Sequence, residues 1–245
     1  INPMQLKPTL EFKKIKGLFS GGQFNGSSGY EEAAAQGILA GINAGLSVKG
    51  EEQVILDRSQ AYLGVLVDDL VTKENHEPYR MMTSRAEYRL LLRQDNADLR
   101  SEIGHRVGLV SDEMYEKVCN KKRLIEEEID RLNKINIGAN PKMQEFLEAH
   151  NSTPLKTGTT LAELIKRPEL DYDMLAEFDS ERKELPNDVI EQVNINIKYD
   201  GYIRRQMKQV EQYKKLENKK ISEEIDYDDV KSLRNEARQK LKLCK

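Results

Sequence analysis

The sequence is poor in the residues that build metal sites and disulfides. Its 245 residues include no tryptophan and two cysteines, Cys119 and Cys244. The three histidines, His76, His105 and His150, lie far apart along the chain. Because zinc sites and disulfide frameworks need such side chains at close spacing, the sequence predicts reduced thiols, as in a cytosolic protein, and no metal site.

Long apolar runs are also missing. No stretch approaches the roughly 18 apolar residues of a membrane-spanning helix, and we find no secretory signal. Charged residues make up 33% of the chain and hydrophobic ones 38%, while the net charge is -3. This balance predicts much solvated helix surface and restricts any nucleic-acid site to a local basic patch. We expect a cytoplasmic protein without membrane association.

The glycines are concentrated near the start of the chain. Eight of the 15 lie between Gly17 and Gly45. Residues 15–20 have the pattern of a short buried strand, residues 21–29 that of a turn, and residues 30–40 that of an alanine-rich helix. A strand, a glycine loop and a helix in this order form the part of a doubly wound sheet that meets a nucleotide cofactor.

The start of this predicted helix has the chemistry of a ligand site. A helix that begins directly after small residues presents free backbone N–H groups and a partial positive charge. Such an end suits a pyrophosphate, or the electron-rich pyrimidine edge of a reduced flavin. Three features favour such a site. Gly22, Gly26 and Gly29 admit a planar cofactor close to the backbone. Ser27 or Ser28 can cap the helix, and Glu31 and Glu32 complement the helix dipole from the first turn. A purely structural glycine turn stays an alternative at this point.

Beyond residue 50 the sequence predicts helices. One begins at about Asp57 and another covers about residues 113–135. A third runs from about Pro186 to Leu216, with apolar residues at four-residue spacing: Val189, Val193 and Ile197, then Tyr199, Ile203 and Met207. Residues 78–93 fit either strands or a turn that enters a helix, and after Asp95 we expect helices only.

A local basic cluster stands out in this part of the chain. Arg80, Arg85, Arg89 and Arg93 lie within 14 residues against one acid, Glu87. The last three recur every four residues, so they would share one face of a helix. Planar guanidinium groups make paired hydrogen bonds to phosphates, and neutralised phosphates release counterions.

Two interpretations of this cluster stay open from the residues alone. Tyr79 and Tyr88 offer rings on which an unpaired base can stack, which favours RNA binding. The alternative is a solvated face whose arginines pair with Glu74, Glu77 and Glu87. A second basic run, from Lys198 to Lys220, is either a solvated helix face or a docking surface for tRNA or a protein, with Arg204 and Arg205 as its best candidates.

The glycine-rich segment resembles a known motif. Residues 17–37 (GLFSGGQFNGSSGYEEAAAQG) are similar to the second FAD motif of the GidA family, also called MnmG, whose members modify the wobble uridine of certain tRNAs. Gln23 stands where many other flavoproteins with two dinucleotide domains have Asp. Residues 57–73, 77–98 and 197–206 resemble further blocks of the family. The sequence departs from the pattern at residues 99–102, which are one residue short, and at Arg234.

The resemblance implies a mainly α fold: the C-terminal piece of an FAD-binding α/β domain, followed by an extended helical domain. We expect the FAD-binding piece at residues 1–50, a linking segment with the tRNA-facing arginine block at 51–110, and a helical domain for tRNA and partner binding at 111–245. Since no GxGxxG occurs, the primary ADP-binding turn is expected upstream of Ile1. The chain is then a fragment with an incomplete FAD site, and it is expected to be inactive alone.

The family also implies an activity and site residues. It implies FAD-dependent addition of a carboxymethylaminomethyl or aminomethyl group to carbon 5 of the uridine, with NADH and methylene-tetrahydrofolate as co-substrates, a GTPase partner, MnmE, and a homodimer. We expect FAD contacts from Gly22, Gln23, Gly26, Gly29, Tyr30 and Glu31. We expect tRNA contacts from Arg80, Arg85, Arg89, Arg93, Arg204 and Arg205. No catalytic residue is assigned, because the family's proposed cysteines lie upstream.

Other functions remain possible alternatives. A folate- and FAD-dependent tRNA uracil methyltransferase has a similar Gly-Tyr-Glu helix but lacks the long helical tail with the block at residues 77–98. A non-catalytic helical adaptor that binds RNA or protein would leave residues 17–45 without a purpose. A flavin reductase without an RNA role would leave the arginine block unexplained.

Overall fold

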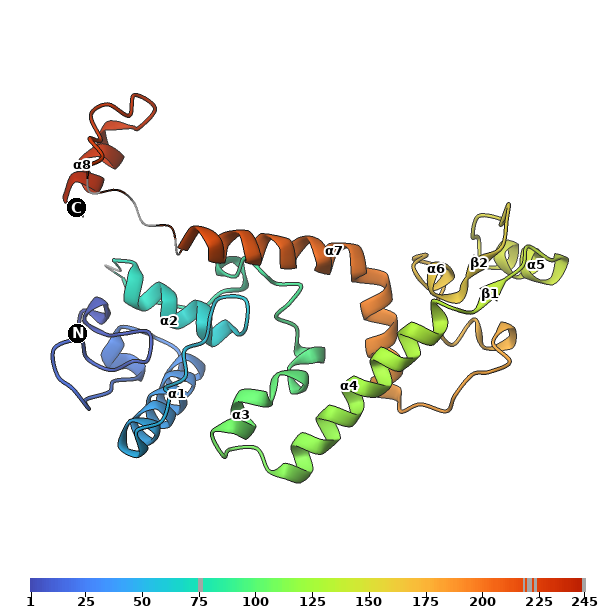
Figure 1. The fold of residues 1–245 in the computed structure, drawn as a ribbon, viewed down its shortest axis with the longest axis horizontal. Helices are drawn as coiled ribbons and strands as arrows, with labels where there is room; N and C mark the ends of the chain where they lie inside the picture. The colour runs from blue at the N-terminus through green and yellow to red at the C-terminus, as the bar shows by residue number, and fades with distance from the viewer. Residues whose placement is uncertain (75–76, 218, 220–221, 223, 244–245) are drawn as a thin grey trace. The chain divides into compact units, whose positions relative to one another are not determined.

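The structure is mainly helical, as expected (Figure 1). It is a computed structural model that describes residues 1–74, 77–217, 219, 222 and 224–243. The chain consists of two compact units, Ile1–Gln206 and Met207–Lys245. Three residues named above, His76, Lys220 and Cys244, lie outside the described residues.

The first 28 residues form loops, bridges and two short 3₁₀ helices, Pro3–Gln5 and Gly22–Asn25. The strand predicted at residues 15–20 is wrong, because Ile15 and Leu18 are 54% and 44% exposed. Isolated antiparallel bridges take the place of a strand, between Leu6 and Phe12 and between Glu11 and Phe19. The Glu11 carboxylate accepts a hydrogen bond of 2.8 Å from the Gly17 amide, which closes the intervening residues into a turn.

Helix α1 (Tyr30–Lys49) begins where the sequence predicts and extends further than expected. It ends because Gly50 adopts a left-handed conformation, with φ of 72°, and its N–H bonds the carbonyls of Leu46 and Ser47. Helix α2 (Tyr62–Thr72) begins five residues later than predicted, because residues 57–60 form a turn that is closed by hydrogen bonds to Asp57.

The two helices share an apolar core with the N-terminal loops. Its buried members are Leu6, Leu10, Leu39, Ala40, Leu46, Val54, Val67 and Val71. Residues 78–93, which follow α2, form neither strands nor a long helix. They contain one 3₁₀ turn, Thr83–Arg85, and two more follow at Gln94–Asn96 and Asp98–Arg100.

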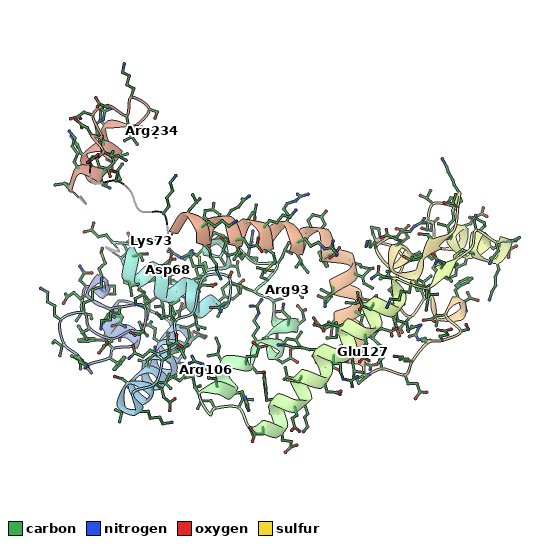
Figure 2. All side chains as sticks on the ribbon, viewed as in Figure 1. Asp68, Lys73, Arg93, Arg106, Glu127 and Arg234 are labelled. Carbon is green, nitrogen blue, oxygen red and sulfur yellow. The ribbon has the colours of Figure 1, made fainter. Side chains whose placement is uncertain are left out.

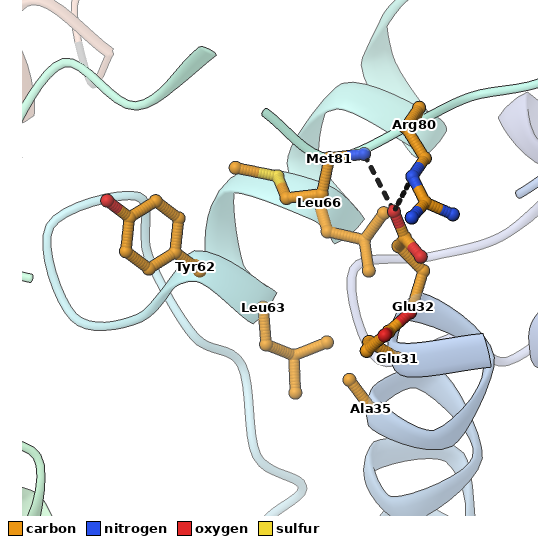
Figure 3. Close-up of a pocket in the computed structure, with 8 residues that line it drawn as sticks. All are labelled: Glu31, Glu32, Ala35, Tyr62, Leu63, Leu66, Arg80 and Met81. Atoms are coloured by element: carbon orange, nitrogen blue, oxygen red, sulfur yellow. Dashed lines mark hydrogen bonds and ion pairs between the residues drawn. The ribbon is translucent and has the colours of Figure 1, made fainter. Parts of the chain in front are cut away.

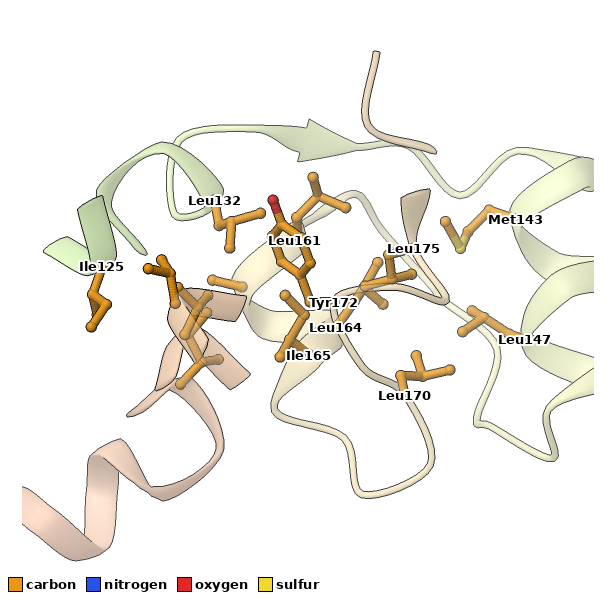
Figure 4. Packing of buried hydrophobic residues seen from close by; sticks show 14 residues of the cluster. Ile125, Leu132, Met143, Leu147, Leu161, Leu164, Ile165, Leu170, Tyr172 and Leu175 are labelled. Atoms are coloured by element: carbon orange, nitrogen blue, oxygen red, sulfur yellow. The ribbon is translucent and has the colours of Figure 1, made fainter. Parts of the chain in front are cut away.

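A second core lies in the helical part of the first unit (Figure 4). It is formed by α4 (Asp112–Leu132), α5 (Pro141–Ala149), α6 (Leu161–Ile165) and the first half of α7 (Asn187–Glu217); a short helix, α3 (Glu102–Arg106), precedes them. Side chains of Ser111, Asn140 and Thr160 cap α4, α5 and α6 by accepting backbone hydrogen bonds. The buried residues are Ile125, Leu132, Met143, Leu147, Leu161, Ala162, Leu164, Ile165, Leu170, Tyr172, Leu175, Val189, Val193 and Ile197.

The expectation of helices only after Asp95 is wrong at one place. Strands β1 (Asn136–Ile137) and β2 (Thr159–Thr160) pair in an antiparallel ribbon, with Asn136 opposite Thr160. A Cβ at Gly158 would lie 3.2 Å from the Ile137 carbonyl oxygen, so the close approach of the two segments favours glycine there. Each strand has only two residues, which is too short for an alternating apolar pattern to predict it.

The long helix α7 confirms the prediction for residues 186–216, and the apolar pattern holds in its first half. Val189, Val193 and Ile197 are buried, whereas Tyr199 and Met207 are each 45% exposed. In the second unit, a further helix, α8 (Asn235–Leu243), has no buried side chain among its described residues.

Candidate functional site

The glycine loop, residues 21–29, is held in shape by a buried amide that the sequence pattern did not identify. The Oε1 atom of Gln36 accepts hydrogen bonds from the Gly22 amide at 3.2 Å and from Asn25 Nδ2 at 2.9 Å. Its Nε2 donates to Ser27 Oγ at 2.7 Å. Because Gln36, Asn25 and Ser27 are almost fully buried, these bonds fix the loop without help from a ligand.

Two glycines of this loop have backbone conformations that other residues rarely adopt. The φ angles of Gly22 and Gly26 are 82° and 83°. Gly22 is also buried against the Ala33 side chain, while a Cβ on Gly26 would meet only open space. Gly26 therefore keeps its backbone accessible on the loop surface.

The start of α1 carries no side-chain cap. Its N-cap is Gly29, so the predicted cap by Ser27 or Ser28 is wrong. Those hydroxyls donate instead to the carbonyls of Gly22 at 3.1 Å and Tyr79 at 3.2 Å. The first amides of α1 therefore lack the hydroxyl acceptor that most helix starts have.

The residues expected to contact a cofactor are arranged around this helix start. Gln23, Tyr30 and Glu31 are exposed, and Tyr30 is 94% exposed. Gly22 and Gly29 are buried, and as glycines they have only backbone atoms to offer a ligand.

The most constrained side chain at this end is Glu32, which the sequence predicted only to complement the helix dipole. Its Oε1 accepts a hydrogen bond of 2.8 Å from the Met81 amide and lies 3.7 Å from Arg80 Nε. Its Oε2 is buried and has no hydrogen-bond partner among the described residues. A Cβ on Gly29 would lie 1.6 Å from this oxygen, so glycine is required to make room for the carboxylate.

The environment keeps Glu32 ionised. The hydrogen bond from the Met81 amide lowers its pKa, burial opposes this, and Arg80 adds a smaller attraction. A buried negative charge with one unused oxygen therefore lies beside the uncapped helix start.

A pocket opens beside Glu32, with a volume of about 380 Å³. Its lining residues are Glu31, Glu32, Ala35, Tyr62, Leu63, Leu66, Arg80 and Met81. Figure 3 shows Glu31, Glu32 and Arg80 on one side and the Tyr62 ring on the other. The pocket thus has a charged wall from α1 and from residues 78–93, which we call the arginine loop, and an apolar wall from α2.

The glycine loop is joined directly to the arginine-rich segment. A parallel bridge pairs Ser27 with Tyr79. The Tyr79 amide donates to the Gly26 carbonyl at 2.7 Å, and the Ser28 amide donates to the Tyr79 carbonyl at 3.0 Å. Two segments about fifty residues apart in the sequence therefore form one backbone-bonded surface.

A buried aspartate on α2 holds the other side of Tyr79. Asp69 is 1% exposed and accepts hydrogen bonds from Tyr79 Oη at 2.8 Å, Arg58 at 2.6 Å and Lys73 at 2.6 Å. Burial raises the pKa of Asp69, but the hydrogen bonds from Lys73, Arg58 and Tyr79 outweigh it and lower the pKa overall. Burial and the bond to Asp69 raise the pKa of Tyr79, so its hydroxyl remains a donor.

The prediction that Tyr79 and Tyr88 offer rings for base stacking is wrong. Their side chains are 2% and 8% exposed. Tyr79 is covered by the Arg85 guanidinium, which lies 4.5 Å from the ring centroid. These tyrosines anchor the loop from inside, and they cannot stack on an RNA base in this conformation.

The four arginines of the cluster do not share a face, since no helix or strand forms there. Arg80 pairs with Glu32, Arg85 lies 4.0 Å from Asp69, and Arg93 pairs with Asp95 at 3.0 Å. None of these three acids is among the partners that the sequence suggested, which were Glu74, Glu77 and Glu87. Arg89 is exposed and has no ion pair among the described residues.

On α7, Arg204 and Arg205 are both exposed. Arg204 pairs with Asp200 at 2.7 Å and is 77% exposed, and Arg205 has no ion-pair partner in the described part of the chain.

Other types of site find little support. Among the described residues, no group of three His, Cys, Asp or Glu side chains is placed to hold a metal ion. Within the same residues, no helix combines the length and the apolar character that a membrane span requires. Cys119 is a free, exposed cysteine of α4.

Comparisons with known proteins cover both parts of this site. Residues 1–52 match the family described as glucose inhibited division protein A, and residues 112–207 match the tRNA modifying enzyme MnmG/GidA C-terminal helical domain. The chain is 66% identical over 246 residues to the tRNA uridine 5-carboxymethylaminomethyl modification enzyme MnmG of Lachnoclostridium phytofermentans, covering 100% of the chain and 39% of that protein. It is 63% identical over 242 residues to the enzyme of the same name from Caldicellulosiruptor saccharolyticus, covering 98% of the chain and 39% of that protein.

A solved structure has the same fold. The structure of Aquifex aeolicus GidA in the form II crystal matches with a TM-score of 0.77 and 43% sequence identity. The match covers 98% of this chain and 38% of that one. The chain spans about 39% of the length of the curated relatives that it matches.

Proposed function

The chain belongs to the GidA family of tRNA-modifying enzymes, also named MnmG, and from that premise we propose that it forms part of an FAD-dependent tRNA uridine-modifying enzyme. The reaction is the addition of a carboxymethylaminomethyl or aminomethyl group to carbon 5 of the wobble uridine. The observation that carries this proposal is the backbone bridge between Ser27 and Tyr79, which joins a glycine loop of cofactor type to an arginine loop of RNA type.

The loop and helix start fit one edge of a flavin. The backbone amides at the start of α1 can donate to ring carbonyl oxygens, and the left-handed glycines Gly22 and Gly26 keep the loop backbone clear of side chains. Glu31 and Glu32 place negative charge in the first turn, which disfavours a doubly charged pyrophosphate at this end. A ring edge with both acceptors and donors suits the site better, because the exposed Glu31 carboxylate can accept from such a donor, whereas Glu32 Oε2 is buried.

Bound flavin would supply the redox chemistry, while these residues orient it and exclude water. We place the contacts at Gly22, Gln23, Gly26, Gly29, Tyr30 and Glu31. The family is FAD-dependent. NADH and methylene-tetrahydrofolate as co-substrates, the GTPase partner MnmE, the homodimer and the cytoplasmic location are proposed from the family resemblance.

Exposed positive side chains support an RNA ligand. Arg89 and Arg205 are the most available of the six arginines proposed to contact tRNA, because neither has an acidic partner among the described residues. Arg80 and Arg204 are exposed but paired. Arg93 is paired with Asp95 at 3.0 Å, and Arg85 lies over the Tyr79 ring, 4.0 Å from Asp69. A phosphate can compete for the exposed pairs, because surface ion pairs are worth only about 0–1 kcal/mol.

A gel shift with tRNA tests the RNA role. We expect the 245-residue chain to bind tRNA with an affinity that falls as salt rises. The Arg89→Ala variant should reduce the slope of log affinity against log salt by about 1. A suitable control is Arg123→Ala, since Arg123 pairs with Glu127 on the exposed face of α4. Equal slopes for the chain and for alanine variants at all six arginines would reject the tRNA assignment.

The flavin role has a separate test. The isolated chain is expected to show weak flavin binding and no turnover, whereas a protein that extends it to the length of the relatives should bind FAD and absorb in the visible range. A colourless longer protein that takes up no FAD would reject the flavin assignment.

The alternatives are not favoured. Both the glycine-rich region and the helical region match the same family, so neither the uracil methyltransferase nor a separate adaptor is needed to explain them.

A further inference from the structure

A second pocket is lined in part by Tyr62. It has a volume of about 380 Å³, within the range of small-molecule sites. Its lining residues are Gln60, Ala61, Tyr62, Leu92, Arg93, Gln94, Asn96, Ala97 and Arg100. Tyr62 also lines the pocket beside Glu32, so the two pockets share this side chain. Two arginines line this second pocket, Arg93, which is among the proposed tRNA contacts, and Arg100, which is not.

Arg100 is the cation whose bonding points to an anionic ligand. Its guanidinium donates to the carbonyls of Gln60 at 3.3 Å and Leu91 at 2.6 Å. No carboxylate among the described residues forms an ion pair with it, in contrast to Arg58, Arg93 and Arg131. Two carbonyl bonds hold the group in place at the pocket without a direct carboxylate partner in the described part of the chain, and Asp57 acts on its charge only from a distance.

The electrostatics around Arg100 agree with this. Burial lowers its pKa, the positive charge of Arg93 lowers it further, and Asp57 opposes both. Arg93 makes a paired interaction with Asp95, so it is a fixed side chain with most of its charge balanced. An anion that reached Arg100 would remove the repulsion between the two arginines.

The remaining walls suit a planar ring. Tyr62 is half-buried and presents an aromatic surface, and Leu92 and Ala97 add apolar contacts. Gln94 is exposed, and its side-chain amide makes no hydrogen bond within the described residues, so it can pair with a polar ring edge. A simple anion would make no use of these walls, whereas an unpaired nucleotide presents a ring and a phosphate together.

We propose that this pocket binds one unpaired nucleotide of an RNA, with its base against Tyr62 and Gln94 and its phosphate on Arg100. The proposal rests on the proposed function, since it specifies where the RNA ligand inserts a base. Stacking on an aromatic side chain and a charge-assisted bond to phosphate are the two interactions that proteins use for single-stranded RNA.

The test uses the 245-residue chain and a fluorescent single-stranded oligouridylate, with binding measured by anisotropy. We expect Arg100→Gln and Tyr62→Leu each to weaken binding by about tenfold, in line with the cost of removing one phosphate contact or one stacked base. Tyr62→Phe, which keeps the ring, should bind as the parent does. Arg106→Gln is the matched control, because Arg106 is an exposed arginine whose side chain, within the described residues, is bonded only to a carbonyl, that of Glu52. Figure 2 shows Arg93 and Arg106 at separate places in the first unit.

Two further measurements separate the possible ligands. A duplex RNA of equal length and a polyglutamate peptide should each compete at least tenfold less well than the single strand. Photo-crosslinking with 4-thiouridine in the oligonucleotide should label residues 60–62 or 92–100. Circular dichroism of each variant confirms that it is folded.

Several outcomes would overturn the proposal. Unchanged affinity in both Arg100→Gln and Tyr62→Leu, or crosslinks confined to other segments, would show that the base lies elsewhere. Equal competition by polyglutamate would indicate a protein or a simple anion as the ligand. If tRNA still shifts in these cases, the proposed function stands and only the pocket fails. If no RNA binds at all, both fail.

Discussion

Two parts of the first unit are built around the same arrangement of side chains. In each, a carboxylate that is 1% exposed accepts a hydrogen bond of 2.8 Å from a tyrosine hydroxyl, and an arginine covers the tyrosine ring. The two clusters consist of Asp69, Tyr79 and Arg85, and of Glu128, Tyr172 and Arg182. Further arginines neutralise the carboxylates, Arg58 in the Asp69 cluster and Arg131 in the Glu128 cluster.

The surroundings of the two clusters differ. Tyr172 is part of the leucine-rich core of α4, α5, α6 and α7, so the Glu128 cluster closes a large apolar interior. Tyr79 packs in a small group with Leu66 and Leu70, and its backbone continues into the glycine loop. The same polar arrangement therefore stabilises a core in one place and positions a loop in the other.

Neutralising each carboxylate should have the largest effect on stability. It should also distinguish the cluster that stabilises a core from the cluster that positions a loop. We expect Asp69→Asn and Glu128→Gln each to lower the free energy of unfolding by about 3 kcal/mol, because each leaves buried cations with fewer charged partners. Urea denaturation measures this loss. Amide hydrogen exchange at residues 79–81 should accelerate in Asp69→Asn and stay unchanged in Glu128→Gln. Equal acceleration in both variants would mean that the clusters are not independent.

Two buried glutamines extend the comparison. Gln36→Leu should cost about 2–3 kcal/mol, because it leaves the Gly22 amide and polar atoms of Asn25 and Ser27 without their partner. Gln192→Leu should cost less. Gln192 is 1% exposed, but its Oε1 has no partner among the described residues and only its Nε2 is bonded, to Asp95. Thermal and urea unfolding of both variants measures the difference, and a larger cost for Gln192→Leu would contradict it.

Two glycines of the first unit should respond to alanine with opposite signs. Gly29→Ala should destabilise by about 1–3 kcal/mol, because the new methyl group would overlap Glu32 Oε2. Gly37→Ala, within α1, meets nothing within 4 Å and should stabilise by up to about 1 kcal/mol through helix propensity. Denaturation curves measure both. Adding Glu32→Ala to Gly29→Ala should recover part of the loss, and no recovery would show that the clash lies elsewhere.

The smallest expected effect is on the loss of stability at acidic pH, through Glu32. The pKa of Glu32 is lowered in the folded state from its ordinary value of 4.5, first by the Met81 amide. Its contribution to stability is therefore present above pH 4.5 and is lost as the pH falls through the folded-state pKa. Between pH 5 and pH 3, Glu32→Gln should lose less stability than the parent chain. Parallel curves of stability against pH would contradict this assignment.

Local sequence signals were enough to predict the long helices. The alanine run after Gly29 and the apolar spacing from Val189 act within a few residues, so the start of α1 and the bounds of α7 were predicted closely. The bounds of α4 were predicted to within a few residues, whereas α1 continues nine residues beyond its predicted end at residue 40. The family was also identified from the glycine segment and the block at residues 77–98.

The loop conformations could not be predicted in the same way. Residues 78–93 take their shape from partners in distant segments, namely Gly26, Glu32 and Asp69, and nothing in their own spacing reveals this. The burial of Tyr79 and the role of Glu32 depend on the same contacts. A glutamate three residues after a glycine N-cap is a weak signal, but it was the one available.

The backbone bridge between Ser27 and Tyr79 also closes the chain between them into a loop. Residues 29–78 leave and return at neighbouring points that are joined by main-chain hydrogen bonds, with α1 and α2 packed in between. A single proteolytic cut near Gly50 would thus produce two pieces that stay associated, each keeping one half of the bridge. Residues 29–78 could then be replaced by another segment without changing the distance between the glycine loop and the segment at Tyr79, because main-chain hydrogen bonds join these two directly.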